Sequence, residues 1–241
     1  GEAGFETFED TEDGIKGYVQ ESLFDENAMN DVISNFMLPD VTINANIQEA
    51  EYKNWNEEWE EAGFERININ DSITIYDARH DDGNGIASGI SIGIETKQAF
   101  GTGTHETTRM IVSTLLNIDL KGKRVLDCGC GTGILGIAAS KLGASEVVGY
   151  DIDEWSSENA IHNAELNGVG NMKVMLGDAS VLKSVEGKFD VVLANINRNI
   201  LLADMPAFVS VMADDSLLIL SGFYASDVDL LIEKASSLGL S

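Results

Sequence analysis

The pattern of hydrophobic and polar positions changes near residue 104 of this 241-residue chain. Beyond that point, short apolar segments alternate with stretches in which apolar residues recur every three or four positions, which predicts strands alternating with helices. The predicted strands cover residues 124–127, 147–150, 172–176, 191–194 and 217–220. The predicted helices cover residues 105–116, 134–142, 155–167, 199–211 and 227–238. This order indicates an α/β fold with a doubly wound, Rossmann-like parallel sheet, covered by helices on both faces.

The first 50 residues predict a different order of elements. Alternating segments at 5–9 and 15–20 flank an acidic stretch and predict a hairpin with a longer turn. Asp25 is a suitable cap for a helix over residues 26–38. Apolar and polar residues alternate again over 41–47, which predicts a half-buried strand. The order strand, strand, helix, strand is that of a ferredoxin-like α+β unit without its first strand and helix.

The middle of the chain has a weaker pattern. Residues 54–62 predict a short helix that carries Trp55 and Trp59 on one face. Residues 63–95 are rich in glycine and aspartate and predict irregular strands and turns. We therefore expect a small incomplete domain over residues 1–52, a linker with the strands that lead into the second domain over 53–95, and the α/β domain over 96–241.

Charge narrows the class of partner. The formal net charge is -26, and residues 1–61 hold 17 Asp or Glu against two lysines, Lys16 and Lys53. Phosphate binding requires clustered Lys and Arg, so we expect no direct contact with nucleic acid. Long-range attraction favours a basic protein partner instead. The alternative, that the acidity serves only solubility, stays open.

Location is constrained by what the sequence lacks. No apolar run reaches the roughly 18 residues that a membrane-spanning helix needs. The acidic first ten residues do not have the order of a secretory signal. The two cysteines, Cys128 and Cys130, are too few for a disulfide framework and fit a reducing compartment. We expect a cytoplasmic monomer with no membrane partner.

The strongest chemical signal lies in residues 125–133. An apolar strand ends near Asp127, and Gly129, Gly131 and Gly133 follow immediately before a predicted helix. Glycines let the backbone turn sharply and touch a ligand, while the helix N-terminus offers free N–H groups. A dinucleotide fingerprint needs its third glycine where Ile134 stands. The spacing therefore favours the methionine part of a sulfonium cofactor over a pyrophosphate.

Polar residues follow three of the other predicted strands. Asp151 stands where a carboxylate accepts hydrogen bonds from both ribose hydroxyls, although it could also cap the next helix. Asp178 is placed to receive the adenine amino group, or is an ordinary turn aspartate. Asn195 would border the transferring methyl group and orient a nucleophilic amine, unless it only fixes its loop.

A loop rich in glycine and threonine, residues 99–108, precedes the glycine turn. Thr104 is a plausible helix cap, with Thr107 or Thr108 in the first turn. Phe100 could offer its ring face to a sulfonium, or simply pack in the core. The three histidines, His80, His105 and His162, show no metal-ligand spacing, so we expect no metal.

These segments resemble the PrmA family, which methylates large-subunit ribosomal protein eleven. The resemblance is carried by AFGTGTHETT at 99–108, VLDCGCGTGILGIAASKLGA at 125–144, GYDIDEWSSENAIHNAELNG at 149–168, DVVLANINRNIL at 190–201 and LSGF at 220–223. The NWNEEW stretch at 54–59 is also similar to the family's linker. Many methyltransferases share the glycine motif, whereas the upstream G-T-G-T-H-x-T-T run is far more specific.

The resemblance implies a class I methyltransferase that uses S-adenosylmethionine, with a ferredoxin-like N-terminal domain that docks the ribosomal protein. The family's cofactor contacts correspond to Thr108, Gly129, Asp151 and Asn195, with Thr104 and Gly131 as neighbours. It also implies that strands are missing at the C-terminus.

On this reading a neutral Lys side chain or α-amine attacks the methyl group, and the protein mainly positions and desolvates the reactants. Asn195 is then the catalytic orienting group, and no dedicated base is expected. The alternatives are a class I methyltransferase with another substrate, a module that binds cofactor without turnover, and an NAD-type dehydrogenase, which Ile134 disfavours.

Overall fold

The computed structural model describes residues 7–11, 14–19, 24–34, 36, 43–48, 63–86, 89–96 and 106–241. The chain forms two compact units, Gly1–Lys53 and Asn54–Ser241. No helix among the described residues is long and apolar enough to cross a membrane.

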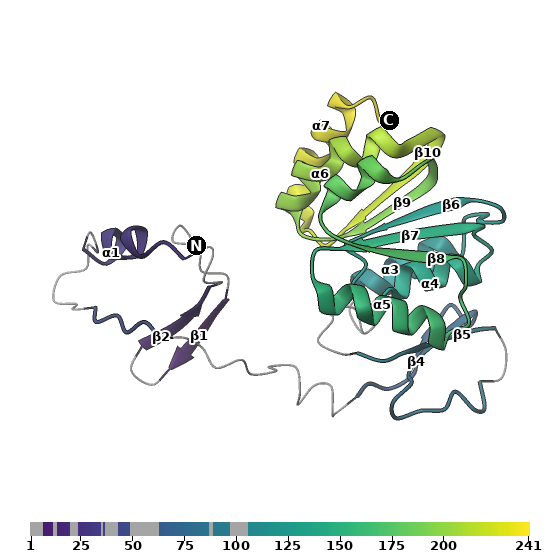
Figure 1. Ribbon diagram of the computed structural model, residues 1–241, viewed down its shortest axis with the longest axis horizontal. Coiled ribbons are helices and arrows are strands. Elements are labelled where there is room, and N and C mark those ends of the chain that lie inside the picture. The colour runs from purple at the N-terminus through teal and green to yellow at the C-terminus, as the bar shows by residue number, and fades with distance from the viewer. Residues whose placement is uncertain are drawn as a thin grey trace. The chain divides into compact units, whose positions relative to one another are not determined.

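The second unit is built around a five-stranded sheet in which every strand pair is parallel. Its strands are β6 (Arg124–Cys128), β7 (Glu146–Asp151), β8 (Met172–Leu176), β9 (Phe189–Asn195) and β10 (Met212–Ser221). Their order across the sheet is β10-β9-β6-β7-β8 (Figure 1). The chain starts in the centre and reverses its direction of growth between β6 and β9. That junction is the topological switch point, outside which ligands of doubly wound sheets bind.

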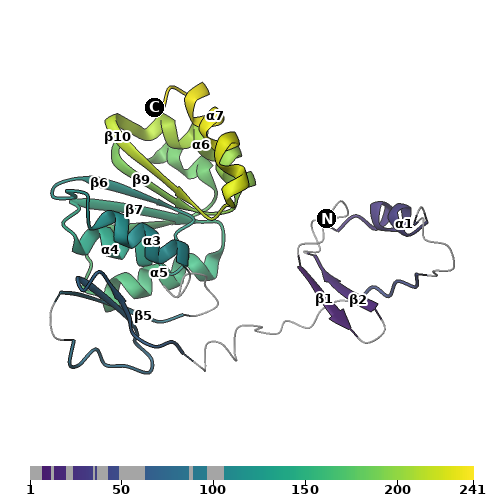
Figure 2. The ribbon, with the colours of Figure 1, turned by 180° about the vertical axis from the view of Figure 1, so that it is seen from behind.

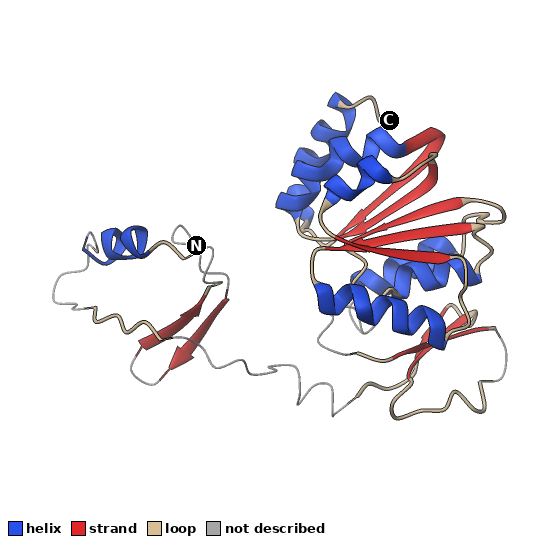
Figure 3. Ribbon diagram, in the orientation of Figure 1, coloured by secondary structure: helices blue, strands red, loops and turns tan. Residues whose placement is uncertain are grey.

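Helices cover both faces of this sheet, as Figure 3 shows by colour. On one face lie α3 (Glu106–Leu115), α4 (Ile134–Lys141) and α5 (Glu154–Leu166). On the other lie α6 (Arg198–Val211) and α7 (Val228–Ser237), as the reverse view in Figure 2 also shows. Two short 3₁₀ helices lie in connections of this sheet: η2 (Ala179–Ser184) follows β8, and η3 (Ala225–Asp227) follows β10. The predicted doubly wound sheet is thus confirmed.

Alternation along the strands explains the two cores. Val125 and Val147 belong to the cluster shared with α3 and α4. Leu126 and Val148, one position further on, belong to the cluster shared with α6. Because successive strand residues point to opposite faces, a continuous apolar run fills both layers.

A second, three-stranded sheet belongs to the same unit. It consists of β3 (Ile67–Ile69), β4 (Ile73–Asp77) and β5 (Ile90–Ile94), with β4 in the middle. The strands β3 and β4 pair antiparallel, whereas β4 and β5 pair in parallel. Their inward-facing isoleucines join the same core as α3 and α4. The part of residues 63–95 that the structure describes is therefore more regular than its composition indicated.

In the first unit the structure describes a hairpin and one helix. Strands β1 (Thr7–Thr11) and β2 (Gly14–Tyr18) pair antiparallel, and the pairing extends to Thr11 opposite Gly14, two positions that were predicted to lie in the turn. Helix α1 (Glu26–Ser34) begins after Asp25, whose carboxylate accepts the Ala28 N–H at 3.0 Å. The predicted cap is confirmed.

The strand predicted over 41–47 is wrong in the part described, because residues 43–48 form neither helix nor strand. Ile43 and Ile47 are exposed. Alternation produces a strand only when a neighbouring strand accepts its backbone hydrogen bonds, and in this unit the described pairing joins only β1 and β2. The predicted helix over 54–62, with Trp55 and Trp59, lies outside the described residues.

Candidate functional site

The glycine loop, residues 129–133, connects β6 to α4 at the carboxyl edge of the sheet. Gly129, Gly131 and Gly133 have φ angles of 65°, 52° and 78°, a region that side chains strongly disfavour. A Cβ atom on Gly129 would lie 2.5 Å from the Ile196 side chain. The loop therefore requires glycine for two reasons, its backbone conformation and the close approach of the loop after β9.

Asp151 ends β7 and holds the glycine loop from the neighbouring strand. Its Oδ2 accepts the Gly131 N–H at 2.9 Å, and its Oδ1 accepts the Asp153 N–H at 3.1 Å. The alternative that Asp151 merely caps the next helix is wrong, because Asp153 caps α5 by accepting the Ser156 N–H at 2.8 Å. Asp151 is only partly buried, so its carboxylate borders both the loop and the solvent.

Asp127, which sequence analysis treated only as the end of a strand, is a buried carboxyl beneath the loop. Its Oδ2 accepts the Gly136 N–H of α4 at 2.9 Å. Its Oδ1 is one of two buried side-chain atoms without a hydrogen-bond partner among the described residues. Burial raises the pKa of Asp127 to about 7; the Gly136 N–H lowers it and the Asp151 carboxylate raises it further. The signal in the sequence was an acid at the end of an apolar strand.

Asn195 and Thr108 are brought together from distant parts of the sequence. Asn195 is the last residue of β9, and Thr108 is buried in the first turns of α3. The Asn195 Nδ2 donates to Thr108 Oγ1 at 3.4 Å, a long hydrogen bond. Across the switch point, Cys128 and Ala194 are paired residues of β6 and β9. Asn195 thus lies beside the end of the strand that enters the glycine loop.

Asp178 lies one strand further along the edge and is exposed. Its Oδ1 accepts the Ser180 N–H at 2.9 Å and so caps η2. Hydrogen bonds from Ser180 lower the pKa of Asp178. Asp178 therefore has the structural role of a turn residue that caps η2. Its contact with the adenine amino group stays a prediction.

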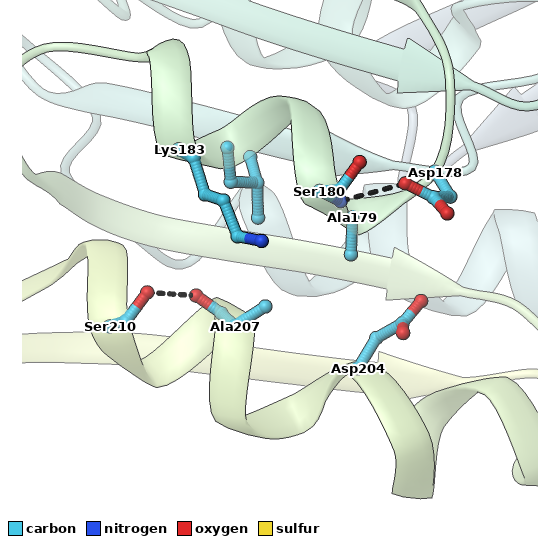
Figure 4. A pocket seen from close by; sticks show the side chains of 8 residues that line it. Asp178, Ala179, Ser180, Lys183, Asp204, Ala207 and Ser210 are labelled. Atoms are coloured by element: carbon cyan, nitrogen blue, oxygen red, sulfur yellow. Dashed lines mark hydrogen bonds between the residues drawn. The ribbon is translucent and has the colours of Figure 1, made fainter.

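A cavity of about 380 Å³ lies between η2 and α6, as the close view in Figure 4 shows. Asp178 and Asp204 lie near one end of it, with Lys183 further along (Figure 4). Burial raises the pKa of Asp204, and the charge of Asp178 adds to that shift. The lining does not include Gly129, Gly131 or Asn195, so this cavity lies beside the predicted cofactor site and shares only Asp178 with it.

Three residues named in the upstream loop, Phe100, Thr104 and His105, lie outside the described residues. The other two histidines make ordinary polar contacts, His80 with Asp77 and His162 with Glu95, each at 2.9 Å. In the part of the chain that the structure describes, no cluster of His, Cys, Asp or Glu could hold a metal ion.

Helix α5 supplies a further group of polar residues that sequence analysis did not single out. Asparagines stand at positions 159 and 163 of this helix and at its C-cap, position 167, at four-residue spacing. Asn163 donates through Nδ2 to the Thr132 carbonyl inside the glycine loop at 3.0 Å. The spacing was visible in the sequence, but the partners on the loop and on β5 were not.

Comparisons with known proteins agree on one family. The family described as ribosomal protein L11 methyltransferase (PrmA) matches residues 2–240. A ribosomal protein L11 methyltransferase of Phocaeicola vulgatus is 50% identical over 240 residues, covering 100% of this chain and 84% of that protein. The protein of that name from Bacteroides fragilis is 47% identical over 240 residues, with 100% and 85% coverage.

Solved structures give the same result for the fold. The crystal structure of a ribosomal protein L11 methylase from Lactobacillus delbrueckii subsp. bulgaricus is 31% identical, has a TM-score of 0.66 and covers 73% of this chain and 89% of that one. A precorrin-6y C5,15-methyltransferase from Geobacter metallireducens is 15% identical, with a TM-score of 0.50 and coverage of 56% and 73%. The second likeness concerns the fold alone.

Proposed function

This chain belongs to the PrmA family of ribosomal protein L11 methyltransferases, and on that premise we propose that it transfers methyl groups from S-adenosylmethionine to amino groups of ribosomal protein L11. The acceptors are Lys side chains, the α-amine or both. The observation that carries the proposal is the glycine loop at the switch point, with Asp151 on one side and Asn195 on the other.

The residues present fit such a cofactor. The loop exposes backbone without Cβ atoms, which permits close approach of a ligand, and it leads into the N-terminus of α4. Each Asp151 oxygen accepts one backbone N–H in the structure and, as a carboxylate oxygen, retains capacity for a ribose hydroxyl. We therefore assign cofactor contacts to Gly129, Gly131 and Asp151.

The other cofactor contacts follow from family membership and position. Thr108 is buried and hydrogen-bonded to Asn195, which supports a place at the methionine end of the site. Asp178 follows β8, next to the strand that carries Asp151, which supports a contact with the adenine amino group. Thr104 is assigned as a further contact on the sequence motif alone.

When bound, S-adenosylmethionine supplies an electrophilic methyl group on a sulfonium centre. The task of the protein is then to hold a neutral amine in line with that methyl group. Asn195 suits this role because its Oδ1 accepts no hydrogen bond from another described residue, while its Nδ2 is directed to Thr108. An amide oxygen that accepts an amine N–H leaves the nitrogen lone pair free to attack. Asn195 therefore acts as the catalytic orienting group.

The N-terminal unit is assigned to substrate recognition. We infer that residues 1–52 belong to a ferredoxin-like domain, and that the second unit, Asn54–Ser241, which includes strands β3 to β5, binds the cofactor. The described hairpin and helix, and the 17 acids against two lysines over residues 1–61, support this division. Acidic surface attracts a basic ribosomal protein by long-range electrostatics. We further propose a monomer that acts in the cytoplasm, where the substrate is made.

Mass spectrometry of purified L11 after incubation with the chain and S-adenosylmethionine tests the function. We expect L11 to gain methyl groups on amines, and we expect the Asp151→Ala variant to add far fewer in the same time. Absence of methylation by a chain that binds the cofactor would transfer the proposal to another amine substrate. Failure to bind the cofactor, together with a thermal shift caused by NAD, would remove the methyltransferase assignment itself.

A further inference from the structure

Helix α5 buries amides where an ordinary helix buries aliphatic side chains. Asn163 has no exposed surface and Asn159 is 3% exposed, although both carry polar groups that are costly to remove from water. A buried amide is retained without penalty only when its donors and acceptors are satisfied. The partners of these amides therefore show what the helix holds in place.

All three asparagines bond the backbone at or just past the free edge of β5: the Asn159 Nδ2 donates to the Glu95 carbonyl at 2.9 Å, and the other two each make a pair of hydrogen bonds. Asn167 accepts the Gly93 N–H at 3.0 Å and donates to the Gly93 carbonyl at 2.6 Å. Asn163 does the same two residues further on: it accepts the Glu95 N–H at 2.9 Å and donates to the Glu95 carbonyl at 3.1 Å. Alternate residues of a strand face the same edge, so two side chains one helical turn apart replace a neighbouring strand.

Only one of these two amides also reaches the glycine loop. The Asn163 Nδ2 donates to the Thr132 carbonyl at 3.0 Å, between Gly131 and Gly133. Asn159 supports it from one turn earlier, because its Oδ1 lies 3.4 Å from the same Nδ2. Asn167 makes hydrogen bonds to the Gly93 backbone and to the Asn163 carbonyl, and none of these bonds reaches the loop.

The helix also touches the loop directly at this point. A Cβ atom on Gly133 would lie 3.1 Å from the Ala160 Cβ and 3.2 Å from its Cα. Ala160 has no exposed surface and lies one turn before Asn163 on the same face of α5. The loop is thus held on one side by Asp151 and on the other by Asn163.

We propose that Asn163 is a positioning residue for the cofactor: it fixes the glycine loop against β5 and so sets the backbone surface on which the adenosyl sulfonium is bound. This proposal rests on the proposed function for the identity of the ligand. Asn163 does not touch the reacting atoms. Its effect is transmitted through the Thr132 carbonyl, whose position fixes the two flanking glycines.

The test compares Asn163→Ala and the isosteric Asn163→Asp with Asn167→Ala. All three disturb the contact with β5, but only the Asn163 variants lose the amide donor to Thr132. The aspartate variant keeps the side-chain volume and the acceptor for Glu95 N–H, and places a carboxylate oxygen against two carbonyls. Calorimetry measures binding of S-adenosylhomocysteine, the demethylated product, and hydrogen exchange measures protection of the loop amides in the ligand-free protein. Thermal unfolding reports stability separately.

We expect both Asn163 variants to bind the product about tenfold more weakly, the value of one net hydrogen bond, and to exchange their loop amides faster. We expect Asn167→Ala to lose thermal stability while affinity and loop exchange stay within about twofold of the wild type. Equal loss of affinity in the Asn167 variant, or unchanged affinity in both Asn163 variants, would overturn the proposal. If the wild-type chain itself does not bind the product, the proposed function fails, whereas the difference in loop exchange still decides whether Asn163 fixes the loop.

Discussion

Helices α4 and α5 lie on the same face of the sheet, and both contact the glycine loop, but they bury different chemistry. The buried residues of α4 are almost all aliphatic: Ile134, Leu135, Gly136, Ile137, Ala138 and Ala139. The buried residues of α5 are small or polar: Ser156, Ser157, Asn159, Ala160, Asn163 and Ala164. One helix is therefore held by the hydrophobic effect and the other largely by hydrogen bonds.

This difference separates what stabilises the fold from what fixes the position of the glycine loop. Burial of apolar surface is non-directional, so it stabilises α4 against the sheet without fixing any loop atom in a particular place. Hydrogen bonds depend on distance and angle, so the Asn163 amide specifies where Thr132 lies. Asp127 is the exception on the α4 side, since it bonds Gly136 but leaves one buried oxygen without a partner among the described residues.

The largest expected effect is on the free energy of unfolding and comes from the apolar core of α4. Ile137 is fully buried in α4, and Ile137→Ala should lower the free energy of unfolding by about 4 kcal/mol, through lost burial and a residual cavity. The folded fraction should still bind S-adenosylhomocysteine within about twofold of the wild type. Urea unfolding and calorimetry measure the two quantities. A large loss of affinity in the folded variant would show that the apolar core of α4 also positions the glycine loop.

Asp127 should make the stability of the fold depend on pH. Its pKa is raised from 3.8 to about 7 by burial, so the folded state binds a proton more tightly than the unfolded chain does. This group's contribution to stability is therefore greatest at low pH and declines as pH rises through the window from 3.8 to 7. As pH rises from roughly 5 to 8, ionisation of Asp127 should lower the free energy of unfolding by about 3 kcal/mol.

The matched variant for this effect is Asp127→Asn, which keeps an acceptor for the Gly136 N–H and cannot ionise. Urea unfolding of both proteins at several pH values isolates the difference from the many other acidic groups. We expect the wild type to lose more stability than the variant as pH rises. Identical pH profiles would show that Asp127 has an ordinary pKa in the folded protein.

Asp151 tests hydrogen bonding on the β7 side of the loop. Asp151→Ala removes the acceptor for Gly131 N–H and the proposed ribose contact together. Affinity for S-adenosylhomocysteine should fall roughly fiftyfold, or about 2.3 kcal/mol, as expected for hydrogen bonds to a charged group. Calorimetry measures the loss, with Asp153→Ala as a control that removes only the cap of α5. Unchanged affinity in Asp151→Ala would exclude a ribose contact.

Substitution of Asn195 should affect the chemical step, and its expected effect is the smallest of the four. Asn195→Ala should reduce kcat about tenfold, near 1.4 kcal/mol, while product affinity changes about twofold. The reason is that the proposed contact of Oδ1 is with the amine, whereas its Nδ2 contact to Thr108 is long. Steady-state kinetics and calorimetry separate the two. Equal losses in both would reassign Asn195 to cofactor binding alone.

The comparison also shows what the sequence could predict. All five parallel strands and their helices were predicted from periodicity, because β6 to β10 and the helices between them each follow one clear pattern. The glycine turn was predicted correctly because its positive φ angles favour glycine, and the structure places Asp151 beside it at the end of β7. Sequence and structure agree where the residues of an element themselves show a clear periodicity or a required backbone conformation.

The missed features depend on partners that are distant in sequence. The regularity of β3 to β5 depends on packing against α3 and α4, so residues 63–95 looked irregular by themselves. The strand predicted over 41–47 had the right alternation but has no strand to pair with among the described residues. The role of Asn163 required both β5 and the glycine loop, which lie 68 and 31 positions away in the chain.

A crystal structure of the chain with S-adenosylhomocysteine is the most direct test of where the cofactor binds. We expect the product over Gly129 and Gly131, with both ribose hydroxyls on the Asp151 carboxylate and the thioether sulfur near Asn195. Product bound elsewhere, for example confined to the cavity between η2 and α6 and out of contact with the glycine loop, would contradict it.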